Sequence, residues 1–502
     1  MFKTRAVRSD VILLWELMAI QSSLVDTQLR AGFARWIARL AAPLTIFVTA
    51  AAVGVSIGWA LVAHRYKPLF ALLALGALAI GPTLSTRARF AMLWASVPLT
   101  VFVTSGVPIP YSLGATTILL AWICGLQLLF PRETDVRVLA DAGSPVLPVL
   151  MLFAAVAAIP AYLNGQTGMW GVVCLAPLLF FWASATLVST ARQAWMIVVA
   201  AVSAMWTFVG FLFFSILVGH ATNLNPQAPW RIGEYLVSWG PIEYPMWSVT
   251  FGTLVGLAVP ALVMLLLRRD STRVVLILAT ACLLASLALL FLSAARGAVV
   301  GAAIGSCLVL FFSGRYMGRL SALLGVVVVT VGVVGLVPLA LGGSLNAGTF
   351  QTNVERIGSL AAGDVSQNAN FRYRMRVLDL SLRESLADPL GPGVGYLGKK
   401  YGLYDEAVMY SVLLLGTGVM GAFAFLAIVV LLVGRYVRAM RHDNNRHDLA
   451  VLGLATLACG LVSGVVTESV LLGPVQSIVW WSILAACYFG CGAPDGGRQR
   501  GG

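Results

Sequence analysis

The sequence predicts an all-α fold, a polytopic transmembrane bundle of about 14 helices (range about 12–14), with one large, partly helical loop outside the cytoplasm. Three observations lead to this prediction. Of the 502 residues, 59% are hydrophobic and only 11% are charged, whereas a soluble domain carries about 25% charged residues. Apolar runs of about 17–25 residues, long enough to cross a bilayer, recur along the chain. Within these runs polar and apolar residues do not alternate, which favours helices over a β-barrel.

The apolar runs predict five parts of the chain. These are an interfacial or cytoplasmic N-terminal arm at 1–41, a bundle of about 11 spans at 42–341, a large outer loop at 342–408, about three further spans at 409–491, and a cytoplasmic tail at 492–502. The predicted spans are 42–63, 68–84, 89–105, 113–130, 144–163, 169–189, 193–218, 246–267, 273–293, 297–313, 320–341, 409–433, 449–467 and 474–491.

The positions of Lys and Arg predict which side of the membrane each segment occupies. With both termini in the cytoplasm, the cytoplasmic segments hold 22 Lys and Arg against 10 Asp and Glu. The outer segments hold 11 and 10, so nearly all of the formal net charge of +13 is cytoplasmic. Topology and contact with anionic membrane lipid explain this basic character, and no nucleic-acid partner is needed.

Two outer segments are long, at 219–245 and 342–408. Within the second, residues 367–389 have the spacing of a helix that begins near Asn368 or Asn370 and ends before Pro389. The following GPGVGYLG is expected to form a flexible turn. Long loops on a rigid scaffold are where binding and catalytic residues concentrate, so these two segments are the first place to search for a site.

Metal, cofactor and ion-coupling chemistry have no sequence signal. The seven cysteines and four histidines do not show metal-ligand spacing, and the outer segments have no carboxylate cluster typical of a Mg²⁺ site. Away from their ends, the spans carry almost no ionisable residues. A proton- or ion-coupled transporter needs such residues near the middle of the membrane, so this class is disfavoured.

Three separate outer segments carry candidate arginines: Arg231, Arg296, and the cluster of Arg372, Arg374 and Arg376. Guanidinium groups bind phosphate through two hydrogen bonds and keep their charge, which suits an enzyme whose leaving group is a lipid-linked pyrophosphate. Because the last three arginines alternate, a helix spreads them around its axis and at most two can face one anion.

Each arginine also has a structural interpretation. Arg231 could be an ordinary solvated charge of the loop. Arg296, considered alone, is better explained as an arginine whose side chain extends to the membrane interface. The alternating arginines are as well explained by ion pairs with acids of their own helix, at positions 379, 384 and 388. The acids Asp405 and Glu406, just before the next span, are candidates for a general base. Alternatively, they are solvated acids at a helix N-terminus, where the helix dipole favours them.

Four segments together resemble a known family. They are LSAARGAVVGA at 292–302 with Arg296, WRIGEY with Arg231 and Gly233, the stretch from Arg374 to Pro389, Leu390 and Gly393, and YSVLLLGTGVMG with Tyr410, Gly418 and Gly421. The set is similar to motifs of the O-antigen ligase and O-antigen polymerase superfamily of bacterial GT-C-type membrane glycosyltransferases. The resemblance covers about residues 220–435. Leu378 stands where the family has Trp, and Ala407 where ligases have a catalytic His, which favours a polymerase.

The resemblance implies a specific reaction. A glycan on undecaprenyl diphosphate is transferred, with inversion and without metal, to a hydroxyl of another lipid-linked repeat unit. Arg231, Arg296, Arg374 and Arg372 would bind the pyrophosphate, and Glu406 or Asp405 would act as base. The large loop would form an active-site lid on the periplasmic face of the bacterial inner membrane. Flippase and chain-length regulator proteins are the expected partners.

Two alternatives remain open. A ligase, which transfers the finished glycan to a lipid A core or another acceptor, would share the same donor site. A lipid-linked oligosaccharide flippase would need charged residues along the inside of its helices, but this chain has them in its outer loops.

Overall fold

The computed structural model describes residues 145–165, 171–188, 190–224, 235–239, 242–246, 248–268, 273–293, 295–313, 369–403, 408–441, 445–465, 469–472 and 474–492. They all belong to one unit of the chain, comprising residues 84–124 and 137–502. The N-terminal arm, the predicted spans before residue 144 and at 320–341, the tail after residue 492, and the candidate residues Arg231, Asp405 and Glu406 lie outside the described residues.

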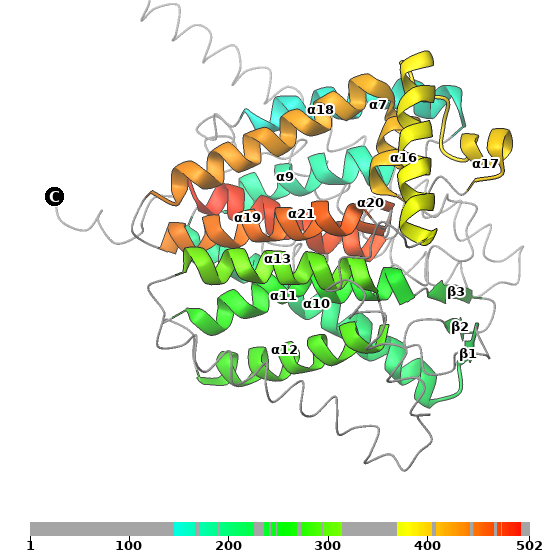
Figure 1. The fold of residues 1–502 in the computed structure, drawn as a ribbon. Coiled ribbons are helices and arrows are strands. Elements are labelled where there is room, and N and C mark those ends of the chain that lie inside the picture. The colour runs from blue at the N-terminus through cyan, green and yellow to red at the C-terminus, as the bar shows by residue number, and fades with distance from the viewer. Residues whose placement is uncertain are drawn as a thin grey trace, which may run out of the picture. The chain divides into compact units, whose positions relative to one another are not determined.

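The described residues form mainly apolar helices (Figure 1). Six are long and apolar enough to cross a membrane: α7 (Val146–Leu163), α10 (Ala191–Leu217), α11 (Ser248–Leu267), α12 (Arg273–Ser293), α18 (Met409–Ala439) and α19 (Asn445–Gly464). Three apolar helices are shorter: α9 (Ala176–Leu187), which follows the π-helix η2 (Gly171–Leu175), α13 (Arg296–Phe312) and α21 (Pro474–Gly490). The prediction of a helical membrane protein is confirmed for this part of the chain.

Most of the described helices begin and end within about four residues of the predicted span limits, but α18 continues past the predicted end at 433 to Ala439. For example, the predicted span 193–218 is α10, whose start is fixed by a capping box. The Thr190 side chain accepts a hydrogen bond from the Gln193 N–H at 3.3 Å, and the Gln193 side chain accepts one from the Thr190 N–H at 3.1 Å. Such reciprocal bonds satisfy amide groups that have no partner within the helix.

Successive spanning helices run in opposite directions, so the start of one helix lies beside the end of another at each end of the bundle. At one end, the start of α13 meets the end of α19, where Ser463 Oγ donates to the Gly297 carbonyl at 3.5 Å. The start of α18 meets the same end of α19, because the Tyr410 hydroxyl donates to the Leu461 carbonyl at 2.9 Å. We call this the loop end of the bundle (right in Figure 1), and the other the opposite end.

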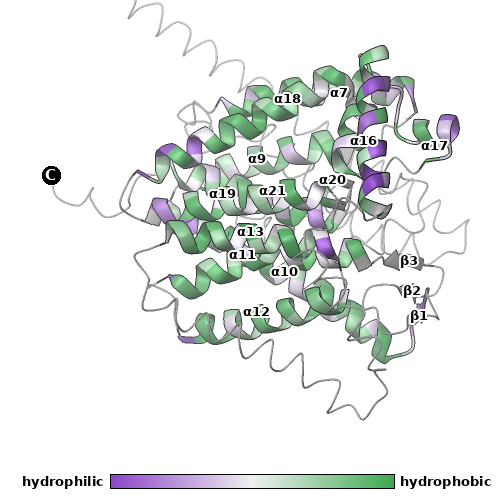
Figure 2. Cartoon of the chain, in the orientation of Figure 1, coloured by the Kyte–Doolittle hydropathy of each residue, from purple (hydrophilic) through white to green (hydrophobic). Residues whose placement is uncertain are grey.

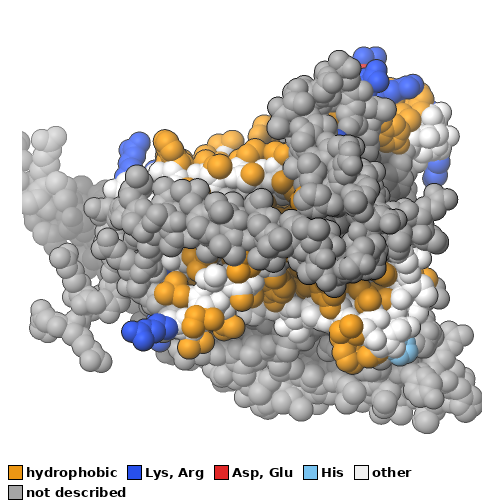
Figure 3. Space-filling model, turned by 60° about the horizontal axis from the view of Figure 1, so that its bottom comes forward, with side chains coloured by type: hydrophobic (Ala, Val, Ile, Leu, Met, Phe, Trp, Pro, Cys, Tyr) orange, Lys and Arg blue, Asp and Glu red, His pale blue; other side chains and the backbone are white. Residues whose placement is uncertain are grey.

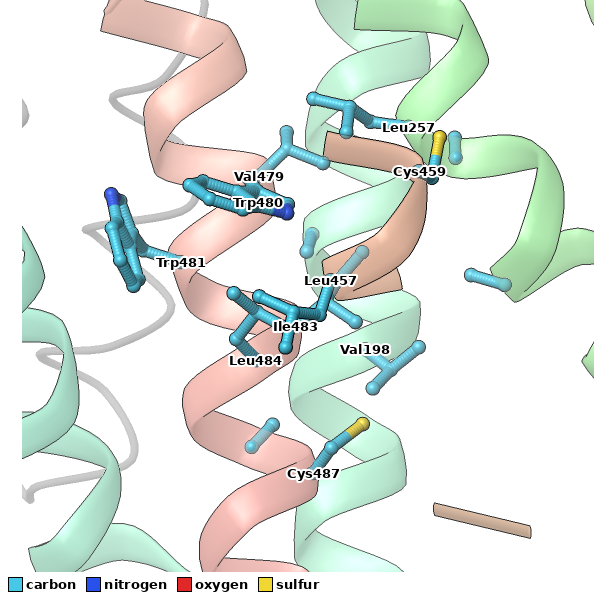
Figure 4. Packing of buried hydrophobic residues seen from close by; sticks show 14 of the residues in the cluster. Val198, Leu257, Leu457, Cys459, Val479, Trp480, Trp481, Ile483, Leu484 and Cys487 are labelled. Carbon is cyan, nitrogen blue, oxygen red and sulfur yellow. The ribbon is translucent and has the colours of Figure 1, made fainter. Parts of the chain in front are cut away.

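The core of the bundle lies around α11, α19 and α21. Most of the apolar stretch of α11 is buried (83%), whereas only 28% of that of α12 is, so α12 faces outward. At the centre, the Trp480 indole of α21 donates a hydrogen bond to the Thr456 carbonyl of α19 at 2.9 Å. Figure 4 shows the Trp480 ring among buried apolar side chains, including Leu457 and Cys459. Gly460 makes room for this ring, since a Cβ there would touch it. Figure 3 shows hydrophobic side chains over the middle of one side, with Lys and Arg toward the two ends.

A small antiparallel sheet follows α10 at the loop end, and the all-α prediction omitted it. It consists of β1 (Ala221–Asn223), β2 (Tyr235–Trp239) and β3 (Ile242–Met246) in the order β1-β2-β3. Only two residues separate β2 from β3, the shortest common hairpin connection. Strands of three to five residues are too short to show a clear alternating pattern, so no strand signal is visible in the sequence here.

The helix predicted within the large loop is confirmed as α16 (Ala369–Ala387), which ends before Asp388 and Pro389 as expected. It crosses the loop end of the bundle instead of running along the spans (Figure 1). Two further short helices lie at this end, α17 (Tyr396–Tyr401) and α20 (Ser469–Leu472). Neither was predicted, because each has too few residues for a helical period to be visible.

Candidate functional site

Arg296 is the first residue of α13, directly after a tight connection from α12. In that connection Ser293 Oγ donates to the Leu290 carbonyl at 2.9 Å and accepts from the Ala295 N–H at 3.4 Å. Helix α11 approaches the connection closely, since a Cβ on Gly252 would lie 2.7 Å from Ser293 Oγ. The backbone that carries Arg296 is therefore held from one side by α11.

Helix α19 holds the same backbone from another side. Besides the bond from Ser463 to the Gly297 carbonyl, a Cβ on Gly301 would lie 2.7 Å from the Cys459 carbonyl. Small residues allow membrane helices to approach this closely. Arg296 itself is partly exposed at the end of this junction, so its side chain extends from a fixed backbone.

The alternating arginines on α16 take different positions. The helix packs on α18 through the buried residues Val377, Ser381 and Ser385. Arg374, one turn before Val377, lies on this same side, and its Nε is buried. Arg372 is exposed on the other side of the helix, as is Arg376. The structure thus separates the two α16 candidates, because Arg374 is directed toward the bundle and Arg372 is not.

Two acids expected to pair with these arginines have partners elsewhere. Asp379 forms an exposed ion pair with Arg383 at 2.9 Å. Glu384 accepts hydrogen bonds from Lys400 at 2.8 Å on both carboxylate oxygens, and from the Tyr401 hydroxyl. These bonds, with that from Lys400 the largest cause, hold the pKa of Glu384 below its ordinary value, and Glu384 in turn raises the pKa of Lys400. The hydrogen bonds of Glu384 thus connect α17 to α16.

The exit of α16 docks into a break in α18. At Gly418 the backbone leaves the helical conformation, with φ 70° and ψ 178°. The groups freed by this break bind the loop, because the Val419 N–H donates to the Pro389 carbonyl at 3.1 Å. The Leu415 carbonyl accepts from the Gly393 N–H at 2.9 Å. The turn that was expected to be flexible is therefore held by two backbone hydrogen bonds.

Asn164, at the end of α7, holds the other side of this turn. Its side-chain amide donates to the Gly391 carbonyl at 3.1 Å. Gly391 and Gly393 have φ values of +88° and +93°, which L side chains rarely adopt. A Cβ on Gly393 would also lie 2.9 Å from Asn164 Cγ. Asn164 could not be identified from the sequence, because a polar residue at the end of a span is common.

These contacts assemble several predicted residues at one end of the bundle. The first half of α18 packs on α16, and α18 also packs on α19, which holds the start of α13. Arg296 and Arg374 are therefore both at the loop end (Figure 1). Leu403 and Val408, which flank Asp405 and Glu406 in the sequence, belong to this end as well. Among the described residues, no three His, Cys, Asp or Glu side chains gather as metal ligands.

No protein-family model matches this chain, and no curated protein matches it. Its function is therefore inferred from the placement and chemistry of its own residues.

Proposed function

We propose that this protein is a polysaccharide polymerase of the bacterial inner membrane, with about 14 spans and both termini in the cytoplasm. It would transfer a glycan from undecaprenyl diphosphate to a hydroxyl of another lipid-linked repeat unit. One observation carries the proposal: two arginines from distant parts of the chain, Arg296 and Arg374, lie at the same end of an apolar helical bundle.

The charges at the opposite end support this orientation. Seven arginines lie at or near helix ends there, against a single described acid, Asp448; they are Arg192, Arg268, Arg273, Arg435, Arg438, Arg441 and Arg446. Cytoplasmic segments of membrane proteins carry an excess of Lys and Arg. With the opposite end in the cytoplasm, the loop end faces the periplasm, where glycan chains are assembled on their lipid carriers.

In the proposed reaction, the acceptor hydroxyl attacks the anomeric carbon of the donor glycan from the side opposite the diphosphate. A new glycosidic bond forms, the bond to the diphosphate oxygen breaks, and the configuration inverts. Arg296 and Arg374 stabilise the negative charge on the departing lipid diphosphate by bidentate hydrogen bonds. Asp405 or Glu406 takes the proton of the hydroxyl. Arg231 is a third candidate ligand, and the outward position of Arg372 makes it the weakest.

A ligase would use the same donor site and differ in its acceptor. The residue where ligases have their catalytic histidine is Ala407 here, next to Glu406, and this favours the polymerase. A flippase is a third possibility, and flippase and chain-length regulator proteins are the partners expected for a polymerase. Neither a metal nor another cofactor has a role in the proposed chemistry.

A deletion strain tests the three functions against one another. Loss of a polymerase leaves single repeat units attached to the final acceptor, which gel electrophoresis and mass spectrometry of the surface glycan detect. Loss of a ligase instead leaves long polymer on the carrier lipid, and loss of a flippase leaves repeat units on the cytoplasmic face. Normal long polymer in the deletion strain would contradict all three.

A further inference from the structure

A row of leucines continues along α16 and beyond its end. Leu382, Leu386 and Leu390 follow one another at four-residue spacing, and 46%, 62% and 49% of their surfaces are exposed. Leu382 and Leu386 therefore lie on the same face of α16, and Leu390 follows in the turn after the helix. A soluble surface rarely carries a contiguous apolar row of this kind without a partner.

The leucine row is one of three faces of α16. The face on α18 contains the buried Val377 and Ser381, and a third face carries exposed basic residues such as Arg372, Arg376 and Arg383. Around the helix axis, Leu382 and Leu386 lie between the bundle face and the basic face. Figure 2 shows this alternation of hydrophilic and hydrophobic residues on α16. An apolar face beside a basic face is typical of a helix in the membrane–water interface.

The leucine row also adjoins the outward side of a membrane helix. The backbone of Leu390 lies against Gly418 of α18, in the docked turn. Two residues further along α18, Met420 is 60% exposed, followed by Phe423 at 64%. In a helical membrane protein, large apolar side chains on the outside of a spanning helix face lipid. The exposed surface therefore continues from the lipid-facing side of α18 to the leucines of α16.

We propose that the leucine row is a membrane contact: Leu382, Leu386 and Leu390 insert among the acyl chains of the outer leaflet. The arginines of the neighbouring face then lie at the phosphates of the lipid headgroups, to which their charge is complementary. A lipid surface accounts for both faces at once, and α16 lies across the spans, in the direction that an interfacial helix takes (Figure 1).

This contact does not depend on the enzymatic activity, but it gives the proposed site a position. Arg374 lies on the bundle face of the same helix. A helix fixed in the interface holds that guanidinium at the depth of the headgroups. The pyrophosphate of a polyprenyl-linked donor lies at this depth too, because its hydrocarbon chain is in the bilayer. This consequence rests on the proposed function.

Site-specific fluorescence in nanodiscs tests the contact. An environment-sensitive dye is attached to Leu386→Cys and, as the matched control on the basic face, to Arg376→Cys. Both are made in a Cys307→Ala background, because Cys307 is exposed, and the background chain gives the residual labelling. The nanodiscs contain phosphatidylethanolamine and phosphatidylglycerol, with or without brominated acyl chains.

The dye at residue 386 is expected to emit at shorter wavelength and to be quenched by brominated lipid but not by aqueous iodide. The dye at residue 376 should show the reverse. Equal iodide quenching at both positions would overturn the proposal, because the row would then face water. Protection at 386 from both quenchers would also overturn it and indicate a protein partner, such as a second copy. Leu382→Cys replaces Leu386→Cys if the latter does not fold. None of these readings depends on polymer formation.

Discussion

The two ends of the bundle are joined in different ways. At the loop end, side-chain bonds such as that from Ser463 to Gly297 are joined by a junction of backbone groups: the turn after α16 binds the break in α18 through carbonyl and N–H groups at positions 389, 393, 415 and 419. At the opposite end, side chains make the connections. His447 of α19 places one ring nitrogen 2.9 Å from the Met440 carbonyl and the other 3.1 Å from the Phe312 carbonyl. The end of α11 is joined to the start of α10 by Arg268 over Trp195 at 4.2 Å.

This difference indicates different tasks. A junction of backbone groups has no side-chain rotamers to vary, so it fixes the relative position of two segments closely and tolerates no added Cβ. A junction of side chains adds stability but allows replacement and small movements. The precise junction is at the end that carries Arg296 and Arg374, which is where a reaction needs fixed geometry. Substitutions at the loop end should therefore affect polymer formation more than those at the opposite end.

The largest effect is expected for Gly418→Ala. Gly418 has φ 70° and ψ 178°, a region almost restricted to glycine, so alanine there costs about 1–3 kcal/mol, and its Cβ would collide with the Pro389 carbonyl. The docked turn should separate from α18, with loss of polymer and a lower unfolding temperature. Gly434→Ala in the same helix is the matched control, because nothing lies within 4 Å of its Cβ position. It should keep full polymer length. Equal behaviour of the two variants would show that the docked turn has no functional role.

His447→Ala is expected to lower stability without changing the reaction. It removes the ring that lies beside the partly buried carbonyls of Met440 and Phe312, and loss of such a hydrogen bond costs about 0.5–1.5 kcal/mol. The unfolding temperature in lipid nanodiscs should fall, whereas polymer length per folded molecule should stay unchanged. Shortened polymer at normal protein abundance would remove the proposed contrast between the two ends.

The smallest effect is expected at the Glu384–Lys400 contact. The pKa of Glu384 is lowered in the folded protein, so its stabilising contribution is complete above the ordinary value of 4.5 and is lost as pH falls below it. Hydrogen exchange of the α17 amides, corrected for intrinsic rates, should then accelerate while the spans stay protected. Glu384→Gln should show fast α17 exchange at neutral pH already. Unchanged protection of the α17 amides through this pH range would show that Glu384 does not hold α17 against α16.

The sequence was sufficient for the features that depend on neighbouring residues. Long apolar runs located the described spans, and the Asp388-Pro389 pair located the end of α16. The alternating spacing of Arg372, Arg374 and Arg376 implied that they could not all face one anion, and only Arg374 is directed toward the bundle.

Features that depend on distant residues were not accessible. Asn164 and Gly391 are 227 positions apart, and no local pattern links them. Gly418 has the surroundings of an ordinary packing glycine in a membrane helix, so neither its positive φ nor the break could be inferred. The strands and α17 are too short to show a period. The resemblance nevertheless named Pro389, Gly393 and Gly418, and the structure brings the segments that contain them into contact.

Arg296→Ala tests the central claim most directly. The variant and the control Arg273→Ala, which removes an exposed arginine at the opposite end, are expressed in the deletion strain at matched protein abundance, and the length of the surface glycan is compared. Removal of a guanidinium that stabilises the departing diphosphate should abolish long polymer, whereas the control should restore it fully. Long polymer of normal length with Arg296→Ala would contradict the proposed role of the loop end.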